Sequence, residues 1–148
     1  MKVSTKGRYG LRAMVDIAMH AQNGNPVFLS EVAKRQDISG KYLEQIFSIL
    51  HSAGLVSALR GRKGGYLLTR SPDKIRIKEI VTALEGPCAF VDCVADETIC
   101  PRSEKCATRD VWSLLSSKVE ELLSGLTLAD LTRMQKEKGE HSAGMYHI

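Results

Sequence analysis

The spacing of apolar residues in the first third of the chain predicts three helices. Over residues 6–22, apolar side chains recur every three or four positions, so they fall on one face of a helix. The Asn-Gly-Asn-Pro run at 23–26 combines helix-breaking residues and ends this helix. The same spacing predicts a short helix over 29–36 and a longer one over 39–53, with a turn at 37–39 between them.

The ends of these helices carry residues that are typical of caps. Ser30 and Ser39 stand near the starts of the second and third helices. A serine hydroxyl there can accept a bond from a free backbone N–H group, so we expect both serines to be N-caps. Gly54 follows the third helix, where a glycine in left-handed conformation commonly ends a helix.

A β-hairpin is predicted after the third helix. Two short runs that favour strands, at 55–60 and 66–69, flank a turn that contains three glycines. The order helix, short helix, turn, helix and hairpin is that of a winged helix-turn-helix. We therefore expect a mainly α-helical fold with a small β-hairpin, in which residues 1–85 form a winged helix-turn-helix domain.

The second half of the chain predicts further helices around an irregular segment. Residues 77–85 form a fourth helix closed by Gly-Pro, and 86–107 lack periodicity. Two helices are expected over 108–137, the second starting at a Thr-Leu-Ala-Asp capping box, and then a flexible tail over 138–148. The first of these helices carries an apolar stripe that predicts a dimer seam. The stripe consists of Val111, Leu115, Val119 and Leu122.

The composition is that of an ordinary globular domain, with 43% hydrophobic and 26% charged residues among 148. No apolar run approaches the ~20 residues that cross a bilayer, and the start of the chain lacks the apolar stretch of a secretory signal. We therefore expect a cytoplasmic protein. In that compartment, four cysteines within 88–106 point to metal or redox chemistry rather than to structural disulfides.

The charge is divided unevenly along the chain. Residues 1–80 hold 14 lysines and arginines against 6 acidic residues, a net charge of +8, whereas residues 81–148 hold 7 against 11, a net charge of −4. A basic half with a winged helix-turn-helix order favours binding to DNA. The candidate DNA-binding residues lie on the exposed N-terminal face of the third helix and on the hairpin tip. They are Ser39, Lys41, Tyr42, Glu44, Gln45, Arg60, Arg62 and Lys63.

The cysteines follow the pattern Cys88-x4-Cys93-x6-Cys100-x5-Cys106. This spacing is neither that of a zinc ribbon nor that of a plant-type ferredoxin. Loops of this length can bring several thiolates around one centre, and thiolates select zinc, copper(I) or iron–sulfur clusters. Structural disulfides, or free thiols that form a disulfide switch, are the alternatives.

Several stretches of the chain resemble the IscR-like (Rrf-type) family of bacterial transcription regulators. The stretches are 3–14, 38–47, 54–57, 60–68 and 106–112. The resemblance implies a homodimer that binds a double-stranded DNA operator, with a dimerisation helix at about 107–124. In family members that carry a cluster, three loop cysteines bind [2Fe–2S] or [4Fe–4S]. Of the two, we expect [2Fe–2S], with [4Fe–4S] as the alternative. Cys93, Cys100 and Cys106 stand at those positions.

The chain departs from the family pattern at the fourth cluster ligand. Arg109 stands where iron–sulfur assembly regulators have a histidine, and Arg8 stands where some relatives have an acidic residue. Arginine stays protonated and cannot bind a metal. Cys88 is then either the fourth ligand or a buried thiol that caps the fourth helix, with equal weight. Asp92 and a small thiol from solution are weaker candidates.

The sequence therefore predicts a homodimeric DNA-binding regulator that senses iron–sulfur or redox status, and not an enzyme. It contains no nucleophile–base pair and no phosphate loop. The main alternative is the same regulator without a cluster, responding to thiol oxidation, zinc or a protein partner. A small iron–sulfur carrier is a distant alternative, because a carrier has no need of a basic reading helix.

Overall fold

The computed structural model describes residues 2–21, 23–61 and 65–145, and within them it is mainly helical with one two-stranded sheet. This confirms the predicted fold class. The longer elements are α1 (Thr5–His20), α2 (Leu29–Gln36), α3 (Gly40–Ser52), β1 (Val56–Leu59), β2 (Gly65–Leu68), α4 (Ile77–Glu85), α6 (Ala107–Gly125) and α7 (Leu128–Met145). Short helices are η1 (Pro72–Lys74), α5 (Asp92–Ala95), η2 (Glu97–Ile99) and η3 (Ser103–Lys105).

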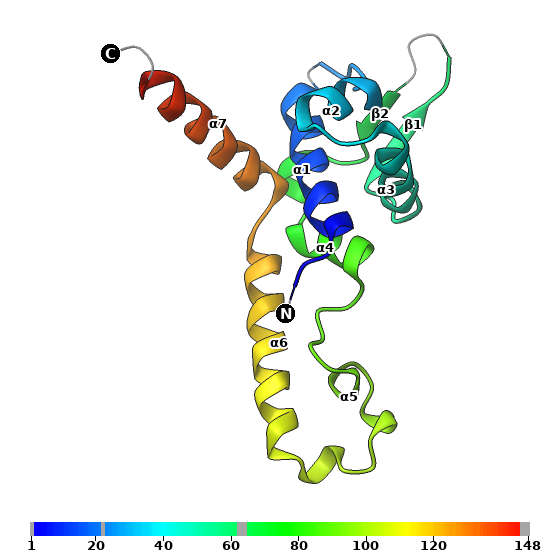
Figure 1. Cartoon of the computed structure of the whole chain (residues 1–148), viewed down its shortest axis with the longest axis vertical. Coiled ribbons are helices and arrows are strands. Elements are labelled where there is room, and N and C mark those ends of the chain that lie inside the picture. Colours follow the sequence, from blue (N-terminus) through cyan, green and yellow to red (C-terminus); the bar gives the residue numbers. More distant parts are fainter. Residues whose placement is uncertain (1, 22, 62–64, 146–148) are drawn as a thin grey trace.

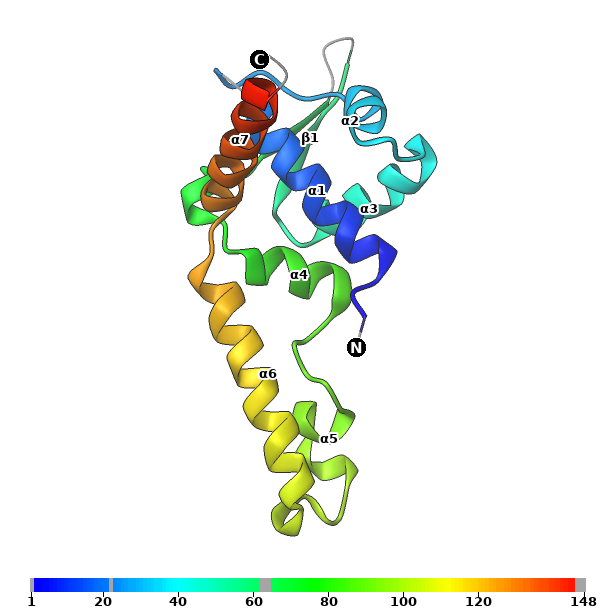
Figure 2. The same ribbon diagram turned by 60° about the vertical axis from the view of Figure 1, so that its left-hand side comes forward.

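The molecule consists of a head and a stalk (Figure 1). The head comprises α1 to α4 with the hairpin. The stalk consists of α6 and, beside it, the cysteine segment, which we define as residues 86–106. α7 continues beyond the end of α6, at an angle to it, and lies against α1, as the second view shows (Figure 2). No helix in the described residues is both long and apolar enough to cross a membrane.

One apolar core fills the head. The largest buried side chains are Phe47 and Met14, and apolar faces of α1, α3 and α4 meet around them. The buried face of α3 is the predicted one. On α1 the periodicity placed Leu11, Val15 and Ala18 on the buried face, but they are half-buried, and the core contains Ala13 and Ile17 instead. Leu128 at the start of α7 is also fully buried in this core, so α7 is fixed to the head at its first turn. Burial of a side chain of this size stabilises the fold by about 2 kcal/mol.

Two glycines allow α1 to cross α4 closely. A Cβ at Gly10 would collide with Leu84 Cδ1 and would lie 3.2 Å from Ile46 Cγ2 in α3. A Cβ at Gly7 would collide with the carboxylate of Glu85. The three helices can therefore pack at this distance because position 10 lacks a side chain, whereas at position 7 the flexible Glu85 side chain could move aside.

The caps agree with the sequence except at α2. Ser39 accepts a bond from the backbone N–H of Tyr42 at 3.3 Å, and Gly54 follows α3 with φ of 74°, as predicted. Ser30 is not a cap, because α2 starts at Leu29 and its N-cap is Phe28, which makes no side-chain cap bond.

The predicted capping box at the start of α7 is confirmed. The backbone N–H of Thr127 donates to Asp130 Oδ2 at 2.9 Å, and the backbone N–H of Asp130 donates to Thr127 Oγ1 at 3.1 Å. The two bonds satisfy N–H groups that a helix start leaves free.

The hairpin is antiparallel, with Val56 opposite Leu68 and Leu59 opposite Gly65. A bridge between Val27 and Tyr66 fastens it to the segment before α2, and the ring of Tyr66 packs edge-on against Phe47 at 5.0 Å. These contacts fix the base of the hairpin relative to α3.

The stalk differs from expectation in three respects. The segment predicted to be irregular contains α5, η2 and η3. α7 continues past residue 137, where its end was predicted, to Met145. The exposed apolar residues of α6 include Val111, Leu114 and Leu122, whereas Leu115 and Val119 of the predicted stripe are half-buried. The stripe is therefore rotated around the helix from the predicted one.

Candidate functional site

The exposed face of α3 presents polar side chains at its N-terminal end. Lys41, Glu44 and Gln45 are all exposed there, while the opposite face of α3 is buried in the core. Ser39 is exposed and bonded to the helix start. The folding physics that buries the apolar face of α3 thus turns its polar residues toward solvent, in the orientation that a major-groove reader requires.

Tyr42 is half-buried, because its ring packs edge-on against Tyr9 of α1 with centroids 6.2 Å apart. The guanidinium groups of Arg8 and Arg12 lie 5.6 Å and 5.4 Å from the centre of the Tyr9 ring. Two cations of α1 therefore adjoin the reading helix. Sequence analysis missed this cluster, since residues separated by more than thirty positions give no local signal.

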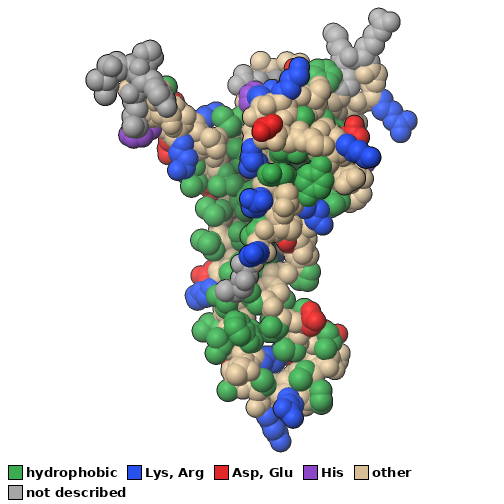
Figure 3. Space-filling view, viewed as in Figure 1, with side chains coloured by type: hydrophobic (Ala, Val, Ile, Leu, Met, Phe, Trp, Pro, Cys, Tyr) green, Lys and Arg blue, Asp and Glu red, His purple; other side chains and the backbone are tan. Residues whose placement is uncertain are grey.

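The wing contributes Arg60, which is exposed just after β1. The other two predicted wing residues, Arg62 and Lys63, lie outside the described residues. Lys and Arg side chains are prominent on the part of the surface over α3 and the hairpin (Figure 3). This charge is suited to contact with a phosphate backbone.

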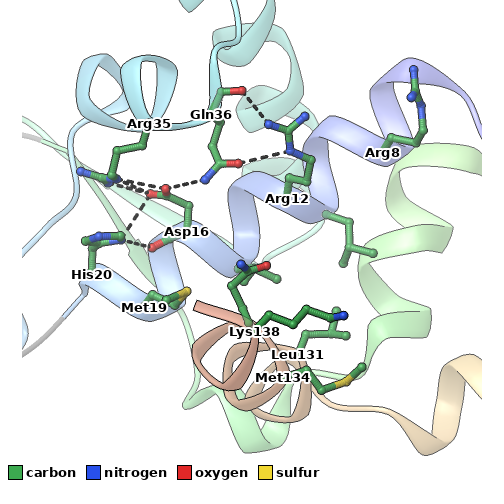
Figure 4. A pocket seen from close by; sticks show the side chains of 13 residues that line it. Arg8, Arg12, Asp16, Met19, His20, Arg35, Gln36, Leu131, Met134 and Lys138 are labelled. Atoms are coloured by element: carbon green, nitrogen blue, oxygen red, sulfur yellow. Dashed lines mark hydrogen bonds and ion pairs between the residues drawn. The ribbon is translucent and has the colours of Figure 1, made fainter. Parts of the chain in front are cut away.

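A buried carboxylate holds α2 against α1. Asp16 of α1, with a side chain 1% exposed, accepts bonds from Arg35 Nη2 at 2.6 Å and Nε at 3.0 Å, and from Gln36 Nε2 at 2.8 Å (Figure 4). Arg12 donates to the backbone carbonyl of Gln36 at 2.6 Å. The hydrogen bond that Arg35 donates to Asp16 raises the pKa of Arg35. This network lines a cavity of about 520 Å³ between α1, α2 and α7.

The four predicted metal ligands all lie on the stalk. Cys88, Cys93, Cys100 and Cys106 are free thiols, and each is half-buried. Within the described residues, no three His, Cys, Asp or Glu side chains are gathered closely enough to hold a metal ion. The structure therefore brings the cysteines onto one segment without assembling them around a centre.

Bonds to α6 hold the cysteine segment in place. The backbone N–H of Phe90 donates to Ser116 Oγ at 3.2 Å. Arg109, in the first turn of α6, donates from Nε to the backbone carbonyl of Cys93 at 2.9 Å and from Nη2 to Glu97 Oε1 at 2.7 Å. The side chain at the fourth-ligand position of the family is thus engaged in bonds within the chain.

Cys106 is the N-cap of α6. Its sulfur lies 3.2 Å from Thr108 Oγ1. That hydrogen bond, together with the backbone N–H of Arg109, lowers the pKa of the Cys106 thiol. A helix N-terminus also favours negative charge, so Cys106 is predisposed to be a thiolate.

Comparison with known proteins identifies the family. The family model for iron-dependent transcriptional regulators named Rrf2 matches residues 3–134. The chain belongs to the Rrf2 family. The match spans the head, the stalk and the first seven residues of α7, so the resemblance seen in the sequence is confirmed.

Individual Rrf2 relatives cover most of the chain. The transcriptional regulator IscR of Aliivibrio salmonicida is 42% identical over 131 residues, which are 88% of this chain and 77% of that protein. The structure of CymR, the global cysteine regulator of B. subtilis, has a TM-score of 0.76 at 39% identity and covers 90% of this chain and 98% of that one. T. potens IscR has a TM-score of 0.75 at 39% identity, over 93% and 90% of the two chains.

These relatives establish that the chain is a helix-turn-helix transcriptional regulator of the Rrf2 family. They are regulators and not enzymes, which confirms that expectation. The donor chemistry of the stalk fits an iron–sulfur cluster, since four free thiols within one segment are the soft ligands that such clusters use.

Proposed function

We propose that this Rrf2 regulator is a homodimer whose affinity for its DNA operator responds to an iron–sulfur cluster held by Cys93, Cys100 and Cys106. The observation that carries the proposal is the stalk itself: four free, half-buried thiols lie on a segment bonded to α6, and α4 links that segment directly to the reading head. Cys88 is the proposed fourth ligand, because Arg109 is engaged elsewhere.

DNA binding would use α3 and the wing. Glu44 can accept a bond from cytosine N4 in the major groove but repels phosphate, so we assign it to base recognition. Lys41 and Arg60, both exposed, would bind the phosphate backbone or the narrow minor groove. Ser39, Tyr42 and Gln45 complete the reading face, and a role for Arg62 and Lys63 at the wing tip stays a prediction.

The proposed dimer seam is the exposed apolar face of α6. Val111, Leu114 and Leu122 are 59%, 64% and 63% exposed, and hydrophobic side chains are frequent along the stalk (Figure 3). A lone helix gains nothing by exposing three large aliphatic side chains on one face, whereas a second copy would bury them.

A bound cluster would supply redox chemistry and a covalent tie among the cysteines that hold it. The chain itself would supply the cysteine thiolates, and its packing would transmit the constraint from the cluster to the head. Joining Cys93 to Cys106 through a centre would fix α5 relative to the start of α6. Since α6 packs on α4, and α4 on α1 and α3, the reading helices of the two subunits would be held in one arrangement.

The decisive experiment is anaerobic purification of the full chain, followed by the visible spectrum and by counts of iron, sulfide and zinc. Cys93→Ala, Cys100→Ala and Cys106→Ala should each abolish the visible absorbance. The matched control Ile99→Ala, at an exposed position beside Cys100, should keep it. Wild-type protein that binds zinc and no iron would refute the cluster, and an unchanged, oxygen-stable spectrum in Cys88→Ala would place the fourth ligand elsewhere.

DNA recognition is tested separately by selection from a random duplex library. Glu44→Ala should change the selected sequence more than the affinity. Arg60→Ala should lower the affinity across sequences and reduce the log–log salt slope by about 0.9 for each phosphate group that is no longer neutralised. Glu31→Ala, at an exposed carboxylate on α2, is the control and should change neither. Unchanged affinity in Arg60→Ala would contradict the role of the wing.

A second candidate is the same regulator working through thiol oxidation. It is favoured by the lowered pKa of Cys106, since thiolates are the form that oxidants attack. The likeness to CymR, a cysteine regulator, is compatible with it. If cluster-free wild-type protein changes its operator affinity on oxidation and Cys106→Ser abolishes that change, this candidate replaces the cluster.

A further inference from the structure

The side chain of Arg109 is mostly buried and hydrogen-bonded within the stalk, although most neighbouring residues of α6 are exposed. Its exposed fraction is only 14%. Two of its guanidinium nitrogens donate to separate acceptors, the backbone carbonyl of Cys93 at 2.9 Å and Glu97 Oε1 at 2.7 Å. Both acceptors belong to the cysteine segment, more than ten residues away in the sequence.

The bond to Cys93 satisfies a carbonyl that α5 cannot satisfy itself. α5 has four residues, so most of its carbonyl groups lack a partner within the helix. A charged donor at 2.9 Å caps one of them. The ion pair with Glu97 adds less, because the Glu97 side chain is 75% exposed and the pair is screened by water.

The guanidinium of Arg109 is suited to bonding both acceptors at once. It is planar and forked, so Nε reaches the Cys93 carbonyl while Nη2 reaches the Glu97 carboxylate, which a lysine ammonium cannot do.

We propose that Arg109 is a positioning residue, a clasp that holds α5 and Cys93 against the first turn of α6. Residue 109 then fixes the position of the cysteine segment and does not act as a metal ligand. The clasp depends only on contacts within the chain, so its test is independent of whether the proposed cluster binds.

Hydrogen exchange on the metal-free full chain tests the clasp. In Arg109→Ala, amides of residues 92–99 should exchange about tenfold faster or more, because a hydrogen bond from a charged donor is removed. Amides of α3 should be unchanged, which excludes general unfolding. Lys118→Ala is the matched control, since it removes another α6 cation that is 69% exposed and pairs only with Glu121. It should leave residues 92–99 unchanged.

Alkylation of single cysteines, resolved by peptide mass spectrometry, provides the second measurement. Arg109→Ala should raise the reaction rate of Cys93 several-fold but not that of Cys88, which lies in a separate pocket between α4 and α6. Glu97→Gln should have a smaller effect than Arg109→Ala on both measurements, because the amide oxygen of glutamine can still accept the bond from Arg109 and only the mostly exposed charge is lost.

Arg109→Lys separates charge from geometry. It should protect residues 92–99 only in part, because a lysine cannot bond both acceptors. Full protection by lysine would overturn the forked clasp, and unchanged exchange and Cys93 reactivity in Arg109→Ala would overturn the proposal altogether.

Discussion

The close crossing of α1 over α4 leads to a sharp prediction at Gly10. Gly10→Ala places a methyl group against Leu84 and Ile46, which are 3% and 0% exposed and cannot move into solvent. Overpacking of this kind costs about 1–3 kcal/mol, and the higher helix propensity of alanine returns about 1 kcal/mol. Because both neighbours are buried, we expect the upper part of that range and a net loss of about 1–2 kcal/mol.

Gly7→Ala is the matched control on the same helix face. Its methyl group meets the carboxylate of Glu85, the end of an exposed and flexible side chain that can swing aside. The swing breaks the exposed bond from the backbone N–H of Ser4, which is 3.1 Å long. We therefore expect a change in stability within about 0.5 kcal/mol, as for ordinary surface substitutions.

Urea unfolding followed by far-UV circular dichroism measures both variants. The double variant Gly10→Ala/Leu84→Ala extends the test, because the added methyl group can enter the space that Leu84 leaves. Leu84→Ala alone should cost about 2–5 kcal/mol, and the double variant should be more stable than the sum of the single changes by about 1 kcal/mol. A Gly10→Ala protein as stable as wild type, or strict additivity, would refute the packing explanation.

Three further predictions concern the seam, the head and the response to acid. Leu122→Glu should convert a dimer to monomer in sedimentation equilibrium, since it places a charge on the exposed apolar face of α6; a dimer that persists would locate the seam elsewhere. Asp16→Asn should lower the free energy of unfolding by about 2–3 kcal/mol in urea, because the partly buried Arg35 loses its charged partner, and a decrease below about 0.5 kcal/mol would contradict this. The hydrogen bond from Arg70 lowers the pKa of Glu79 below its ordinary value of 4.5. The ionised carboxylate therefore stabilises the folded state above about pH 4.5, and this stabilisation is lost as the pH falls through the lowered pKa of Glu79. The stability difference between wild type and Glu79→Gln should accordingly shrink below about pH 4.5, and a difference that is constant with pH would show that the pair contributes nothing.

Elements with strong local signals could be predicted from the sequence. The fourth helix is predicted over 77–85 and is observed as Ile77–Glu85, because an apolar face ends there at a Gly-Pro pair. The hairpin and α3 are likewise marked by glycines and by an apolar face. Boundaries fail where no such marker exists: residues 138–145 lack periodicity and contain Gly139 and Gly144, which disfavour helices, yet they continue α7 to Met145.

Contacts between residues that are far apart in the sequence could not be predicted from it. Asp16 stands on a helix face that is otherwise buried, and nothing local indicates that Arg35 and Gln36 will neutralise it. The chemistry of Arg109 shows from the sequence that it is unsuited as a metal ligand. Its acceptors could not be predicted, because they depend on how a segment without periodicity folds back onto α6.

The stalk makes α6 a lever whose pivot is at α4. With 19 residues, α6 is about 28 Å long, and it is joined to α4 by the ion pair between Lys78 and Glu120 as well as by packing. Glu120 and Cys106 are 14 residues or about 21 Å apart, so a tilt of about 5° at the pivot moves the Cys106 end by roughly 1.8 Å. Conversely, a displacement of ångström size imposed on the thiols reaches the head as a rotation of a few degrees. Such a rotation would reorient the head relative to the stalk while the core of the head stays intact.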